Sequence, residues 1–197
     1  MIDDLDRTLE ELLRRELPQN LVGQVTISFA TPDDQFPPSS VSLPAIDLFL
    51  YDIRENRELR TNEWQIERQN GIATKRRPPT RVDCSYLITT WASGTSTTPA
   101  LDEHRLMGEV MRALLRHPTI PEEVLQGRFQ GQEPPMPAAA LLPDHLQSLG
   151  EFWQALGGKP KAAFHYTVTI SVEVQEPVQV GLVTDARLRI QQSAGGG

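Results

Sequence analysis

The 197-residue chain has few of the features that mark secreted, redox-active or membrane proteins. Its single cysteine, Cys84, excludes an internal disulfide. Because the neighbours of Cys84 are apolar, we expect a small core residue and not an activated nucleophile. Asp and Glu crowd the first thirty residues, where a signal peptide would carry its apolar segment. No stretch approaches the roughly twenty apolar residues that span a bilayer, so no membrane insertion is expected.

Patterns that carry catalysis or bind metals are also missing. No histidine pair has the four-residue helical spacing of a zinc site, and there is no cysteine pair. Neither a GxSxG nucleophile motif nor a phosphate-binding loop occurs. Asp47 and Asp52 share one predicted strand but point to opposite faces, which is poor geometry for a paired-carboxylate site. We therefore expect a protein that is not an enzyme and that binds no cofactor and no metal.

Charge is distributed unevenly along this chain of formal net charge −7. Acidic residues crowd positions 3–16, whereas basic residues gather between positions 68 and 81. The negative total argues against general attraction to nucleic acid, and the basic stretch lacks the interleaved aromatics that stack bases. Two interpretations of the asymmetry stay open: a solvated surface, or patches suited to head-to-tail self-association.

The apolar periodicity of the first half predicts helix and strand in one domain. Residues 2–16 form an amphipathic helix that ends before Pro18. The runs at 46–53 and 82–91 are apolar on both faces, which is typical of central strands. Residues 63–69 are interpreted as the hairpin partner of the 46–53 strand, followed by an Asn-Gly turn.

The second half continues the α+β pattern. A helix capped by Asp102 extends to about residue 117 with a broad apolar stripe, and Asp144 caps a shorter helix. Residues 164–174 alternate between apolar and polar, so one face of this strand is half exposed or meets a partner. A final strand within residues 178–190 is expected beside it.

These elements predict a single domain over residues 1–192. Two loops rich in proline interrupt it, at 31–44 and 131–143. The glycine-rich residues 193–197 are expected to be a disordered tail.

Several segments together resemble one known family. They are Ile2–Asp6 with the helix that follows to Pro18, Leu48–Asn56, Leu59–Trp64, Pro78–Asp83, Tyr86–Trp91, Glu103–Gly108 and Leu114–Pro118. In combination they are similar to the tube terminator, or cap, proteins of extracellular contractile injection systems, which are phage-tail-like particles. The family was first catalogued as a domain of unknown function. The resemblance covers roughly residues 1–175.

The resemblance implies a phage tail-terminator-like fold with a mixed, mostly antiparallel sheet flanked by helices. It implies a homo-hexameric ring on the distal end of the inner tube, which stops tube growth and contacts the last sheath layer. The expected partners are thus the inner tube protein and the sheath protein, with cytoplasmic assembly as part of an injection particle. An alternative of another class is an adaptor or cargo-docking module of the same particle.

The basic stretch and its surroundings supply the candidate interface. Its residues are Arg54, Arg57, Arg60, Trp64, Arg68, Lys75, Arg76, Arg77 and Arg81. Our hypothesis is that the hairpin and loop from Trp64 to Arg81 face a neighbouring subunit or the tube end. Reversing the charges of Arg76 and Arg77 would then disturb assembly and leave the monomer folded.

Overall fold

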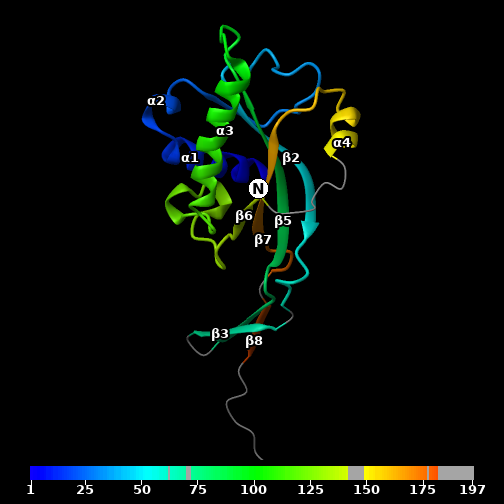
Figure 1. Cartoon of the computed structure of the whole chain (residues 1–197). Coiled ribbons are helices and arrows are strands. Elements are labelled where there is room, and N and C mark those ends of the chain that lie inside the picture. The colour runs from blue at the N-terminus through cyan, green and yellow to red at the C-terminus, as the bar shows by residue number, and fades with distance from the viewer. Residues whose placement is uncertain (62, 70–71, 142–148, 177, 182–197) are drawn as a thin grey trace, which may run out of the picture.

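The computed structural model describes residues 1–61, 63–69, 72–141, 149–176 and 178–181. Within these ranges the chain forms a mixed sheet of five strands, in the order β1-β2-β5-β7-β6, and a smaller sheet of three strands, in the order β3-β4-β8. Figure 1 shows helices on both sides of the larger sheet and the smaller sheet extending from one end. This arrangement confirms the predicted α+β class.

The elements have the following bounds. The helices are α1 (Ile2–Glu16), α2 (Gln19–Val22), α3 (Pro99–Leu115), α4 (Leu149–Ala155) and the short 3₁₀ helices η1 (Glu122–Val124) and η2 (Gly127–Phe129). The strands of the larger sheet are β1 (Thr26–Ser28), β2 (Ala45–Glu55), β5 (Thr80–Trp91), β6 (Ala138–Ala140) and β7 (Ala163–Val172). The strands of the smaller sheet are β3 (Gln65–Gln69), β4 (Ile72–Arg76) and β8 (Val178–Gly181).

The middle strand of the larger sheet is β5. It pairs antiparallel with β2 on one side and with β7 on the other. β6 pairs antiparallel with the far side of β7, and β1 lies parallel to β2 at the opposite edge. The two apolar runs of the sequence therefore become β2 and β5, as their two-sided hydrophobicity predicts.

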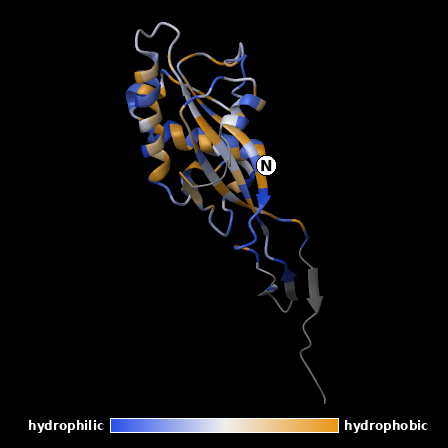
Figure 2. Cartoon of the chain, turned by 45° about the vertical axis from the view of Figure 1, so that its right-hand side comes forward, coloured by the Kyte–Doolittle hydropathy of each residue, from blue (hydrophilic) through white to orange (hydrophobic). Residues whose placement is uncertain are grey.

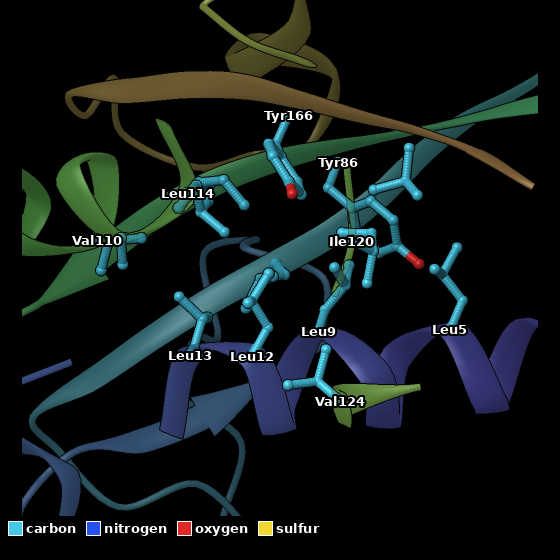
Figure 3. Packing of buried hydrophobic residues seen from close by; sticks show 14 of the residues in the cluster. Leu5, Leu9, Leu12, Leu13, Tyr86, Val110, Leu114, Ile120, Val124 and Tyr166 are labelled. Carbon is cyan, nitrogen blue, oxygen red and sulfur yellow. The ribbon is translucent and has the colours of Figure 1, made fainter. Parts of the chain in front are cut away.

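One face of the larger sheet is covered by α1 and α3, as the amphipathic pattern of α1 predicts. Leu5, Leu9, Leu12 and Leu13 of α1 are fully buried. Figure 3 shows them pointing toward the sheet, together with labelled side chains of β5, β7 and α3. Burying each leucine stabilises the fold by about 1.5–3 kcal/mol, so this helix is a main source of stability.

The other face of the sheet carries aromatic contacts with α4. Phe152 of α4 lies 6.4 Å from Phe49 and 5.9 Å from Tyr51 between ring centroids. The adjacent Trp153 is 1% exposed. Figure 1 places α4 on the side of the sheet opposite α1 and α3. Both faces of β2 are thus covered.

Two predicted strand pairings are wrong. β3 pairs with β4 and not with β2, which pairs along its length with β5 and over Ala45–Asp47 with β1. β8 pairs with β4 and not with β7, which lies between β5 and β6. The Asn-Gly turn and the predicted strand residues beyond 181 lie outside the described residues, as does the predicted tail at 193–197.

Local features also differ from the sequence interpretation. Thr98 is the N-cap of α3, and Asp102 instead accepts a hydrogen bond from the Ser96 hydroxyl at 2.6 Å. The loop at 131–143 contains the edge strand β6. The predicted cap Asp144 lies outside the described residues.

The polar face of β7 is buried, whereas the sequence pattern left it half exposed or partner-bound. Thr167 and Thr169 are each 7% exposed. Thr167 and Ser85 share a hydrogen bond of 3.1 Å, and Thr169 donates to Asp83 at 2.7 Å. Hydrogen bonds across neighbouring strands therefore satisfy these hydroxyls inside the protein.

Asp47 is a fully buried carboxyl group on β2. Its Oδ1 accepts a hydrogen bond from the Ala30 amide at 3.1 Å, while its Oδ2 has no partner among the described residues. Burial raises the pKa of Asp47 to about 7, against the opposing effect of hydrogen bonds from Ser28 and Ala30. The group therefore titrates near neutral pH.

Replacing Leu9 with alanine should lower the free energy of unfolding by about 2–5 kcal/mol, because it removes fully buried methyl groups and leaves a cavity. Urea denaturation measures the change. The matched control is Glu11→Ala on the exposed side of α1, which should stay within about 0.5 kcal/mol of the parent. Equal effects of the two changes would contradict the packing of α1.

The folded-state pKa of Asp47 lies above its ordinary value of 3.8, so the folded protein binds an extra proton between about pH 4 and pH 7. The stability that this proton contributes is lost as the pH rises through 7. In the parent, the free energy of unfolding should fall by on the order of 2–4 kcal/mol between pH 4 and pH 7. Asp47→Asn should abolish this fall. Urea titrations at several pH values measure it. Asp34→Asn, on the exposed loop, should keep the parent's pH dependence; an unchanged profile in Asp47→Asn would refute the assignment.

Candidate assembly interface

The three-stranded sheet of β3, β4 and β8, which we call the arm, projects from the end of the larger sheet (Figures 1 and 2). Its strand β4 leads directly into β5 through Pro78 and Pro79. On the other side, β7 leads toward β8. The arm is therefore attached to the two strands that form the middle of the larger sheet.

Trp64 is the aromatic centre of the arm's basic cluster. Its side chain is 39% exposed. The Lys75 ammonium lies 4.1 Å from the ring centroid, and the Arg77 guanidinium carbon lies 4.7 Å from it. Lys75 and Arg77 are two residues apart on extended chain and so share a side. Such cation–π contacts contribute about 0.5–1 kcal/mol each at exposed sites. They order the side chains of the cluster but leave its positive charges unneutralised.

Arg76, between these two cations, forms an ion pair with Glu173. This pair joins β4 to the chain that follows β7. Reversing the charge of Arg76 would therefore break a contact within the chain as well as alter the surface. Lys75 and Arg77 are the better positions at which to test an intermolecular role.

A hollow of about 300 Å³ lies beside Trp64 at the base of the arm. Arg60, Pro78, Pro79 and Val174 also line it. Val174 is 64% exposed. Val174 and Glu173 are not among the interface residues predicted from the sequence. The only sequence feature that points to them is the alternating pattern of apolar and polar residues, which continues beyond the end of β7.

The other predicted arginines are distributed around this base. Arg54 pairs with Asp52 at 2.6 Å, and Arg60 pairs with Glu55 at 3.6 Å. Arg57 is exposed on the loop after β2. Arg68 lies on β3, and its side chain is outside the described residues. The structure thus gathers Arg60, Trp64, Lys75 and Arg77 at one place.

Arg81 is a buried member of the predicted interface set, although it lines the same two hollows as Pro78 and Pro79. It is 7% exposed. Its guanidinium donates hydrogen bonds to the Ser171 hydroxyl at 2.6 Å and to the Pro135 carbonyl at 2.9 Å. Because these partners lie on β7 and in the loop before β6, Arg81 holds that loop against the sheet.

The acidic start of the chain lies near the base of the arm. The N-terminal ammonium contacts Asp3 at 2.5 Å and Asp4 at 3.2 Å. Met1 and Arg76 line the same hollow of about 670 Å³. Part of the acidic charge is therefore balanced within the chain, and the acidic and basic segments do not lie at opposite ends of the molecule.

Groups that could bind a metal ion do not converge in the part of the chain that the structure describes. No three histidine, cysteine, aspartate or glutamate side chains there come close enough to hold a metal ion. Burial raises the pKa of the Cys84 thiol to about 12. No helix among the described residues is both long and apolar enough to span a bilayer.

Residues 4–185 match the Pvc16 N-terminal domain family. The chain belongs to this family. The match extends from α1 through the arm, so it includes both the larger sheet and the candidate interface. A search of curated proteins found no match.

Two solved structures share the fold. One is the sheath/tube terminator of an extracellular contractile injection system, PVC, in its extended state: it is 25% identical, has a TM-score of 0.72, and the match covers 98% of this chain and 64% of that one. The other is the tube-terminating cap of the anti-feeding prophage, at 24% identity, a TM-score of 0.68, and coverage of 96% and 61%. This chain thus spans less than two thirds of either protein. The resemblance drawn from the sequence is confirmed.

Arg81→Ala should lower the free energy of unfolding by about 2–3 kcal/mol, because it leaves buried carbonyl and hydroxyl acceptors without donors. The matched control is Arg77→Ala, which removes an exposed cation and should cost about 1 kcal/mol or less. Urea denaturation compares the two. Similar small losses for both would show that Arg81 has no structural role.

Proposed function

We propose that this chain terminates the inner tube of a contractile injection system. In this proposal, six copies form a ring on the distal end of the tube and stop its growth. The ring also contacts the last layer of sheath, and the particle is assembled in the cytoplasm. The observation that carries the proposal is the likeness to a sheath/tube terminator over 98% of this chain.

The shape of the protomer supports a role in assembly. A closed ring of identical subunits needs a heterologous interface, in which two different surfaces of the protomer meet. A body with an arm on one side offers such unlike surfaces (Figure 1).

Ring formation is tested by measuring mass. The purified chain, alone and mixed with short tubes of the cognate tube protein, should yield a species of about six subunits by light scattering or native mass spectrometry. Electron microscopy should show it at one end of each tube. A chain that stays monomeric even when tubes are present would contradict the ring.

Control of length is tested by deletion in a particle-producing strain. Without the gene, tubes and sheaths should have a broad length distribution in electron micrographs, and supplying the gene on a plasmid should restore a narrow one. Normal, empty particles of uniform length in the deletion strain would instead support the adaptor alternative and contradict the terminator function.

A further inference from the structure

No described helix packs on the arm as α1, α3 and α4 pack on the larger sheet. The arm is a sheet of only three short strands that extends away from the helices (Figures 1 and 2). Among the residues that the structure describes, its outer strands, β3 and β8, each pair only with β4. Small sheets of this kind are marginally stable unless another element packs on them, and free strand edges are ready templates for pairing with another chain.

Charge is unbalanced at the same place. Among the described residues, Lys75 and Arg77 form no ion pair, whereas the nearby Arg60 and Arg76 each have a carboxylate partner. Both unpaired cations lie over the Trp64 ring. Two fixed cations on one aromatic side chain favour a ligand that brings carboxylates.

Exposed apolar side chains surround these cations. Leu59, Trp64 and Val174 are 46%, 39% and 64% exposed. Trp64 and Val174 line the hollow of about 300 Å³, and Leu59 lines a second hollow of about 550 Å³. Pro78 and Pro79 line both, so the two hollows adjoin. Aromatic side chains next to arginine are characteristic of the energetic centres of protein interfaces.

We propose that the surface at the base of the arm, formed by Leu59, Trp64, Lys75, Arg77 and Val174, binds an extended acidic segment of a different protein chain. Carboxylates of the segment pair with Lys75 and Arg77, and an apolar side chain fills the hollow beside Trp64. The inference goes beyond the proposed function, since it concerns the chemistry of a partner and does not depend on ring formation.

Nucleic acid fits the surface less well. The ring of Trp64 already carries two cations, so a base would have to displace them in order to stack. A second copy of the chain is less suitable as well, because its acidic first turn is partly neutralised by its own N-terminal ammonium.

The test uses the full chain and a fluorescein-labelled peptide of about ten residues that alternates glutamate with threonine and has one central phenylalanine. Binding is measured by fluorescence polarisation at low and physiological salt. We expect saturable, salt-sensitive binding that weakens at least about tenfold in Lys75→Glu/Arg77→Glu. The peptide with glutamine in place of glutamate should bind at least about tenfold more weakly to the parent.

The matched control is Arg105→Glu/Arg112→Glu, which reverses two exposed cations on α3 and should bind the peptide like the parent. Circular dichroism confirms that each variant is folded; if the charge reversal is not, Lys75→Gln/Arg77→Gln takes its place. Trp64→Ala should weaken binding while keeping both charges.

Several outcomes would overturn the proposal. They are no saturable binding, equal loss in the α3 control, or stronger binding of a single-stranded oligonucleotide that Lys75→Glu/Arg77→Glu abolishes. Self-association of the parent that is lost in the arm variant would assign the surface to a second copy instead. None of these results bears on tube length in the deletion strain, so the two proposals fail separately.

Discussion

The pairing of β5 with β2 and β7 is the interaction on which the rest of this molecule depends. It buries Tyr86 and its neighbours beneath the leucine stripe of α1, and it presents the opposite face to α4. The same strands continue toward the arm. The core and the proposed interaction surface are therefore joined by one pair of hydrogen-bonded ladders, with the core at one end and the arm at the other.

Arg81 marks the transition between these two regions. Its neighbour in sequence, Thr80, begins β5, and its two terminal guanidinium nitrogens donate hydrogen bonds to groups from β7 and from the loop before β6. Beyond this point the exposed arginines and Lys75 contact carboxylates or aromatic rings at the surface. A run of basic residues thus has two physical roles, one inside the fold and one outside it, separated by a few positions.

The helices and the middle strands could be predicted because their signals are local. The leucines of α1 recur at helical spacing, and β2 and β5 are apolar on both faces. The pairing partners of β3 and β8 could not be predicted, because a strand with many polar residues carries no pattern that identifies its neighbour. Pairing also depends on which edges longer strands have already filled. For the same reason Arg81 resembled its exposed neighbours: its burial depends on acceptors some fifty to ninety residues away.

The continuity of β5 and β7 with the arm has a mechanical consequence. A load applied to the arm along the strands would pull β5 and β7 in the same direction, because both reach the arm at the end of the pair Thr80–Val172, and it would be carried in shear by the ladders that join them to β2 and β6. In that geometry the hydrogen bonds share the force and must break together, whereas a load across the strands would break them one after another. The domain should accordingly resist pulling along its long axis far better than peeling from the side.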